Sequence, residues 1–228
     1  MADQIPFEAN PFADAELIKN TEPRCACILL LDISGSMQGA AINELNAGLV
    51  QFKDELAADS LGTKRVEVAV VTFGEGVQVA TDFCNPDVFI APNLKAAGST
   101  PLGAALNKAL DLLADRKQKY RENGIHYYRP WIFLVTDGAP TDEWQTASSR
   151  LKEAQSTNKL SFFPVAVQGA NLDVLKQISM TEPINLQGLR FRDMFKWLSS
   201  SLKSVSHSKP EEKVQLDNPT APAGWGSV

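Results

Sequence analysis

Oxygen-bearing side chains follow an apolar run near the start of the chain. Residues 28–31 are all Ile or Leu, Asp32 comes next, and Ser34 and Ser36 follow on either side of Gly35. If the apolar run is a buried strand, the three side chains can converge just past its end, while Gly35 permits a sharp turn. One carboxylate and two hydroxyls suit a hard cation such as Mg²⁺, which prefers oxygen ligands. Further ligands must come from elsewhere in the chain.

Two later segments can supply them. Thr100 precedes Pro101 and a stretch with helical periodicity, residues 102–120, while Asp137 follows an apolar run at residues 131–135. In a doubly wound sheet, loops at the carboxyl ends of neighbouring strands meet where ligands bind. The sequence therefore predicts one metal site built from three loops, with the ligands Asp32, Ser34, Ser36, Thr100 and Asp137.

The elements that must position these residues alternate between strands and helices. Apolar residues recur at helical spacing in several segments, and β-branched or aromatic runs lie between them. Helices are expected at residues 40–57, 102–120, 144–154, 172–178 and 191–205, and strands at 25–31, 66–73, 77–81, 131–135, 160–167 and 184–186. The short Gly74–Gly76 link predicts a hairpin and hence one antiparallel edge strand. We expect an α/β fold, doubly wound, with a mostly parallel central sheet and helices on both faces.

The periodic segments define a single domain with two irregular ends. Residues 1–24 contain three prolines and no regular period, so they are expected to form an arm in which Phe7 and Phe12 pack against the domain. The domain itself is expected to span residues 25–206. Residues 207–228 are rich in Pro, Gly and charge and should form an extended tail. Trp225 within it is either an anchor on the domain or a docking element.

Composition limits the possible partners. The chain of 228 residues carries a formal net charge of −5 without a dense block of Lys or Arg, which disfavours a nucleic-acid surface. Three cysteines in a chain of this size favour a reducing compartment. The N-terminus lacks the pattern of a secretory signal, and no apolar run approaches the roughly 20 residues needed to span a bilayer. We therefore expect a cytoplasmic protein without membrane insertion.

The three site segments resemble those of a known family. DISGS after an apolar strand, GSTP before a helix and TDG after another strand resemble a von Willebrand factor A (VWA) domain with a metal-ion-dependent adhesion site. This resemblance implies that Ser34 and Ser36 bind the metal directly. It also implies that Asp32, Thr100 and Asp137 bind it directly or through water.

A more specific resemblance is carried by longer segments. PRCACILLLDISGSM, RVEVAVVTFG, YYRPWIFLVTDGAPTDEWQ, GLRFRDMFKWLS and NPTAPAGW are similar to bacterial tellurite-resistance-associated, TerY-type A domains. That similarity implies a cytoplasmic stress-response role beside a phosphatase and a kinase. Zinc-ribbon tails found in some relatives are not expected here, because the sequence has no CxxC pair.

The donor chemistry indicates adhesion rather than cation storage. Two carboxylates balance one divalent ion, so an Asp or Glu from a partner protein could enter an open coordination position, whereas four carboxylates would repel it. We therefore expect a metal-dependent protein-binding module using Mg²⁺ or Mn²⁺, and not an enzyme. The alternatives are a metal-dependent phosphoester hydrolase and a metal-free scaffold.

Several motifs allow a structural and a functional interpretation. Asp and Ser in the first loop could simply cap a helix. Asp142, Glu143 and Trp144 either cap the next helix or, through Asp142 and Trp144, form a rim that contacts the partner. The last predicted helix is most simply core, although in the VWA family it can shift with metal coordination. The cysteines at 25, 27 and 84 are expected in the core rather than on a metal.

Overall fold

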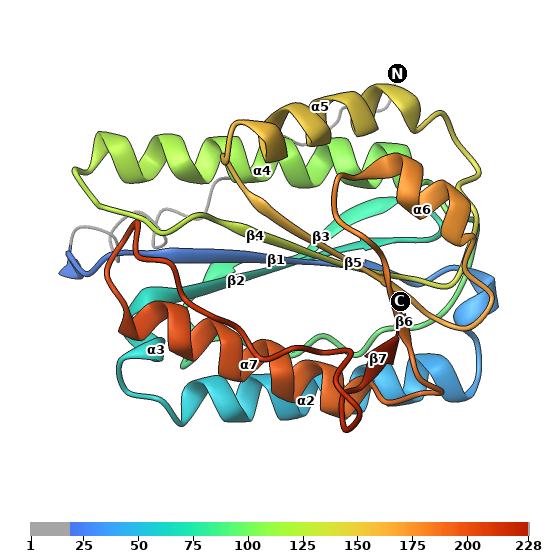
Figure 1. Cartoon of the computed structure of the whole chain (residues 1–228), viewed down its shortest axis with the longest axis horizontal. Helices are drawn as coiled ribbons and strands as arrows, with labels where there is room; N and C mark the ends of the chain where they lie inside the picture. The colour runs from blue at the N-terminus through green and yellow to red at the C-terminus, as the bar shows by residue number, and fades with distance from the viewer. Residues whose placement is uncertain (1–18, 228) are drawn as a thin grey trace, which may run out of the picture.

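The computed structural model describes residues 19–227 and contains a central sheet covered by helices on both faces (Figure 1). Seven strands of this part of the chain form one sheet in the order β3-β2-β1-β4-β5-β6-β7. They are β1 (Cys25–Asp32), β2 (Val66–Phe73), β3 (Val77–Cys84), β4 (Trp131–Thr136), β5 (Ser161–Ala166), β6 (Ile184–Leu186) and β7 (Gly226–Ser227). The predicted fold is confirmed: β2, β1, β4, β5 and β6 are parallel to one another, and β3 is the antiparallel edge strand that follows the Gly74–Gly76 link.

The helices divide between the two faces of the sheet. The helical elements are η1 (Gly35–Met37), α2 (Ala40–Ala57), α3 (Gly62–Arg65), α4 (Leu102–Glu122), α5 (Gln145–Ser156), α6 (Leu172–Ile178) and α7 (Phe191–His207). In Figure 1, α4, α5 and α6 cover one face, while α2, α3 and α7 lie on the other. No helix within residues 19–227 is both long enough and apolar enough to cross a membrane.

Strand β1 shows why its sequence is continuously apolar. Cys25, Cys27, Leu29 and Leu31 belong to the core beneath α2 and α7, whereas the alternate side chains between them belong to the core beneath α4 and α5. Because side chains of a strand alternate between faces, a strand covered on both sides needs apolar residues at every position. The expected core location of Cys25 and Cys27 agrees with their full burial.

The tail returns to the domain over its last residues. β7 pairs antiparallel with β6, which the sequence analysis did not predict. Trp225 is buried, with its ring 5.8 Å from that of Trp197, whose indole N–H donates to the carbonyl of Asp217 at 2.8 Å. Of the two interpretations of Trp225, the structure therefore supports an anchor. The expected contacts of Phe7 and Phe12 lie outside the described residues.

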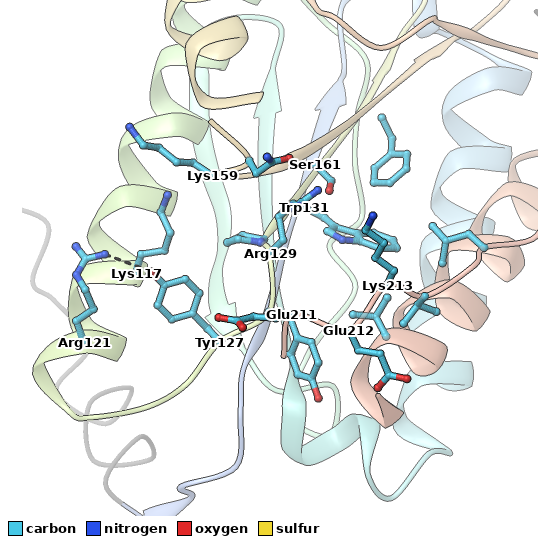
Figure 2. Close-up of a pocket in the computed structure, with 17 residues that line it drawn as sticks. Lys117, Arg121, Tyr127, Arg129, Trp131, Lys159, Ser161, Glu211, Glu212 and Lys213 are labelled. Carbon is cyan, nitrogen blue, oxygen red and sulfur yellow. Dashed lines mark hydrogen bonds between the residues drawn. The ribbon is translucent and has the colours of Figure 1, made fainter. Parts of the chain in front are cut away.

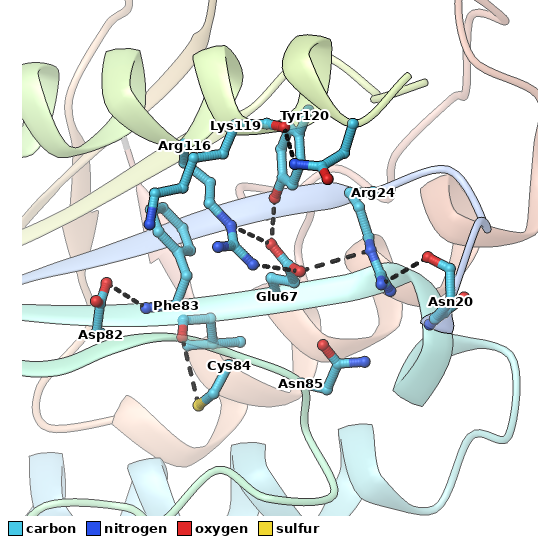
Figure 3. Close-up of polar contacts among 12 residues, drawn as sticks. Asn20, Arg24, Glu67, Asp82, Phe83, Cys84, Asn85, Arg116, Lys119 and Tyr120 are labelled. Atoms are coloured by element: carbon cyan, nitrogen blue, oxygen red, sulfur yellow. Dashed lines mark hydrogen bonds and ion pairs between the residues drawn. The ribbon is translucent and has the colours of Figure 1, made fainter. Parts of the chain in front are cut away.

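A buried ionic network joins β2 to α4 and to the segment before β1 (Figure 3). Glu67 receives two hydrogen bonds from the Arg116 guanidinium, at 2.8 and 2.7 Å, and a third from the Tyr120 hydroxyl. The Nε atom of Arg24 lies 3.5 Å from the same carboxylate. All four side chains are buried, so this carboxylate is neutralised within the protein.

Candidate metal centre

The predicted ligands lie at the carboxyl end of the sheet. Asp32 is the last residue of β1 and Asp137 directly follows β4, and these two strands are neighbours in parallel register, with Leu31 opposite Val135. The parallel register places the two carboxylates at the same end of the sheet, as expected for a doubly wound fold.

Hydrogen bonds join the first and third loops. The Ser34 and Ser36 hydroxyls are 3.0 Å apart, and the Ser36 hydroxyl donates to Oδ1 of Asp137 at 2.7 Å. Oδ1 of Asp32 accepts from the backbone N–H of Ser34 at 2.8 Å, and its Oδ2 accepts from the Thr136 hydroxyl at 2.6 Å. The structure thus brings Asp32, Ser34, Ser36 and Asp137 into one polar cluster.

Thr100 joins this cluster from the loop before α4. A methyl group placed on Gly138 would lie only 2.8 Å from the Thr100 hydroxyl, so this hydroxyl packs closely on the residue after Asp137. The backbone N–H of Thr100 donates to the Thr141 hydroxyl at 3.1 Å, and the Thr141 N–H donates to the Thr100 carbonyl at 2.9 Å. Gly138 and Thr141 therefore fix the second loop against the third.

Glycines also fix the first loop against the second. The N–H of Gly35 donates to the carbonyl of Gly98 at 3.0 Å. Gly98 has a φ of 84°, and a Cβ there would lie 2.4 Å from the backbone nitrogen of Glu75. Both the left-handed backbone and the close approach require glycine at position 98.

The electrostatics of the cluster differ from those of a structural ion pair. Asp32, Ser34, Thr100 and Asp137 are buried, whereas Ser36 is exposed. Burial raises the pKa of Asp32, and Asp137 adds to this, against the opposing hydrogen bonds from Ser34 and Thr136. In the described part of the chain, neither carboxylate forms an ion pair with a basic side chain.

Two carboxylates and three hydroxyls form a donor set that suits a hard divalent cation. Within residues 19–227, no three His, Cys, Asp or Glu side chains form a group that could hold a metal, so the described residues contain no site built mainly from carboxylate, imidazole or thiolate ligands. The donor set therefore fits Mg²⁺ or Mn²⁺ completed by water or by an external ligand, and does not fit a zinc site.

Supporting residues of this cluster were missed in the sequence. Thr136 holds Asp32, and Thr141 holds Thr100 from both sides. Thr136 is part of the TDG segment and Thr141 lies four residues after Asp137, so both were visible as hydroxyls. The partner of Thr136 is 104 residues away and that of Thr141 is 41 residues away, so both contacts depend on strand register and loop packing.

The proposed rim residues have structural contacts of their own. The Asp142 carboxylate accepts from the N–H groups of Gly103 and Ala104, at 2.9 and 2.8 Å, and so caps α4 rather than the next helix. Glu143 accepts from the N–H of Thr146 and caps α5. Trp144 is partly buried against the core beneath α4 and α5. Partner contact by Asp142 and Trp144 stays a prediction.

Solved structures with this fold come from proteins of several kinds. Proximal thread matrix protein 1 from the mussel byssus is 18% identical, with a TM-score of 0.55, and the match covers 82% of this chain and 46% of that one. The pilus adhesin SpaC from Lactobacillus rhamnosus GG is 13% identical, with a TM-score of 0.62 and coverage of 82% and 31%. The ArnB paralog VWA2 from Sulfolobus acidocaldarius is 16% identical, with a TM-score of 0.52 and coverage of 78% and 45%.

At these identities the similarity concerns the fold, and the chain spans less than half the length of each of these three proteins. No curated protein matches the sequence. The family model of the von Willebrand factor type A domain matches residues 27–194, most of the chain. The chain therefore belongs to the von Willebrand factor type A domain family.

Proposed function

We propose that this protein is a metal-dependent protein-binding module. A bound Mg²⁺ or Mn²⁺ would supply a coordination position for an aspartate or glutamate of a partner protein. The residues that would hold the ion are Asp32, Ser34, Ser36, Thr100 and Asp137.

The carrying observation is a pair of neighbouring carboxylates that form no ion pair with a basic side chain of residues 19–227. Ser36 donates to Asp137, and Ser34 and Thr136 donate to Asp32, and all three donors are neutral. Two negative charges can balance one divalent ion, which leaves no surplus charge to repel an incoming carboxylate. The hydroxyls orient the carboxylates, and exposed Ser36 marks the side from which a partner residue can approach.

Family membership supports binding over catalysis. One relative with this fold is described as a pilus adhesin, and the five site residues include neither His nor Lys that could act as a general base. A metal-dependent phosphoester hydrolase would need such a base or a second metal. We therefore propose that the protein is not an enzyme.

For the biological setting we propose a bacterial cytoplasmic stress-response system of the tellurite-resistance type. The support is the similarity of segments such as residues 23–37 and 127–145 to TerY-type domains. The acidic ligand would then come from a phosphatase or a kinase of that system. Net negative charge agrees with a protein partner rather than nucleic acid.

Metal titration tests the site directly. Mg²⁺ and Mn²⁺ are titrated by calorimetry into the wild type, Ser34→Ala, Asp137→Ala and the control Asp115→Ala, which removes an exposed aspartate on α4. We expect binding in the wild type and the control and at least a tenfold loss in the two site variants. Equal binding by all four proteins would overturn the metal site.

Partner capture tests the use of the site. Candidate phosphatase and kinase partners are captured on immobilised wild type and Ser34→Ala, each with Mg²⁺ and with EDTA. We expect capture only by the wild type with Mg²⁺. Capture that ignores both EDTA and the substitution would favour a metal-free scaffold, and phosphoester turnover lost in the same variants would favour the hydrolase.

A further inference from the structure

A second cavity lies at the opposite end of the sheet from the metal centre. It has a volume of about 910 Å³ and is formed where β4 and β5 begin, with the end of α4 on one side and the tail on the other (Figure 2). Trp131 is the first residue of β4 and Ser161 the first of β5, whereas the metal centre lies where β1 and β4 end. The cavity therefore lies at the amino ends of the parallel strands, and the metal centre lies at their carboxyl ends.

One part of this cavity is cationic. Lys117 and Arg121 come from α4, Arg129 from the segment before β4, and Lys159 from the segment before β5. None of the four forms an ion pair with an acidic side chain of residues 19–227. Burial lowers the pKa of Lys117, and repulsion from Arg121 and Lys159 lowers it further. These cations crowd together in a chain whose net charge is −5.

The other part of the cavity has aromatic and aliphatic side chains, beside Glu212 and Lys213 of the tail. The rings of Trp131 and Phe163 are 4.8 Å apart, and Val205 and Leu216 line the same side. Tyr127, whose hydroxyl accepts a hydrogen bond from Arg121 at 3.4 Å, adds an aromatic ring to the lining. Figure 2 shows Lys117, Arg121 and Lys159 on one side of the cavity and Trp131 toward the other. A ligand that fills it must combine negative charge with an apolar body.

The tail already brings a carboxylate to this place. Glu211 lines the cavity and has a φ of 75°, in a region that residues other than glycine rarely adopt. Glu211 is exposed and forms no ion pair with the four cations, which would attract a more highly charged anion more strongly than a single carboxylate.

We propose that this cavity binds an organic polyphosphate, with the phosphates on Lys117, Arg121, Arg129 and Lys159 and an aromatic body against Trp131 and Phe163. A nucleoside triphosphate has this combination of charge and ring. Binding would displace the Glu211 carboxylate, so the tail would respond to the ligand.

Calorimetric titration with ATP tests this site, in EDTA so that the metal centre cannot contribute. We expect ATP to bind the wild type, with at least tenfold weaker binding by Lys117→Ala and by Arg121→Ala. Lys108→Ala is the matched control, because Lys108 is an exposed lysine of the same helix that does not line the cavity, and its affinity should equal that of the wild type. Glu211→Gln should bind ATP several-fold more tightly because a competing carboxylate is lost.

Three further probes define the ligand class, and circular dichroism confirms that each variant is folded. Adenosine should not bind, and inorganic tripolyphosphate should bind more weakly than ATP. Absence of ATP binding to the wild type, or an equal effect of Lys117→Ala and Lys108→Ala, would overturn the proposal. Tripolyphosphate as tight as ATP would overturn the role of the aromatic side, and an acidic peptide that displaces ATP would identify a protein ligand instead. None of these outcomes depends on the metal centre.

Discussion

Two buried carboxylates in this domain have different kinds of partner, charged for Glu67 and neutral for Asp32. Glu67 in β2 is met by two guanidinium groups and a phenol, all from the protein itself (Figure 3). Asp32 at the end of β1 is equally buried, but within residues 19–227 its donors, Ser34 and Thr136, are neutral. Both carboxylates lie in the same sheet, so burial alone does not distinguish them.

The two carboxylates differ in whether the described part of the chain supplies the opposite charge. A buried charge must be paired or it strongly disfavours folding. Glu67 satisfies this rule within the chain, whereas Asp32 and Asp137 form no ion pair with a basic side chain of residues 19–227, which is what the proposed metal site requires.

Breaking the internal pair should have the largest effect. Glu67→Ala leaves the Arg24 and Arg116 guanidinium groups buried without their carboxylate, and we expect the free energy of unfolding to fall by about 3–5 kcal/mol. Urea denaturation measures this free energy of unfolding. The matched control is Asp111→Ala, which breaks the exposed pair with Arg150 and should change stability by less than about 1 kcal/mol. Similar losses in the two variants would show that the buried network contributes no more than a surface pair.

Filling the unpaired site should have the next largest effect. Mg²⁺ at 100 times its Kd should raise the free energy of unfolding of the wild type by about 2.7 kcal/mol, because it binds only the folded state. Asp32→Asn should keep the apo stability, since the amide oxygen can still accept from the Ser34 N–H and the Thr136 hydroxyl can turn to accept from the amide nitrogen, but should lose the response to Mg²⁺. Thermal unfolding with and without Mg²⁺ measures both. A full response in Asp32→Asn would separate Asp32 from the metal.

The sequence predicted the fold well where periodicity was strong. The bounds expected for α2 and α6 match the structure, because each helix packs an apolar stripe on the sheet, α2 on one face and α6 on the other. Both β7 and α3 were missed. Two residues carry no pattern, and β7 pairs with β6 next to Trp225, whose ring packs on Trp197.

The candidate site was predictable as residue types but not as a supporting network. All five proposed ligands belong to local motifs, and the structure brings them to the carboxyl end of the sheet. Neither Thr136 nor Thr141 could be assigned a role, because their partners are set by strand register and loop packing. Glu67 was equally hidden, since its partner Arg116 is 49 residues away.

Substitution of Asp142 sharpens the distinction between support and ligand binding. Asp142→Ala removes the carboxylate that caps α4, and we expect a loss of about 1 kcal/mol in the free energy of unfolding. Mg²⁺ affinity should change less than threefold, because the carboxylate is engaged with the helix. Urea denaturation and calorimetry measure the two quantities. A large loss of Mg²⁺ affinity with unchanged stability would place Asp142 in the site instead.

The smallest expected effect concerns the pH dependence of stability that comes from the Cys25 thiol, which lies near Glu67. Burial raises the pKa of Cys25 to about 12, and the charge of Glu67 adds to the rise. The unfolded chain therefore loses this proton at lower pH than the folded chain, so stability should fall as pH rises through the ordinary thiol range and on toward 12. Between pH 8.5 and 9.5 this one thiol should account for roughly 0.7 kcal/mol. Denaturation at both pH values should show a correspondingly smaller decrease in Cys25→Ala than in the wild type. An identical pH dependence would mean that the thiol ionises as easily in the folded protein as in the unfolded chain, which its place beside a carboxylate inside the sheet argues against.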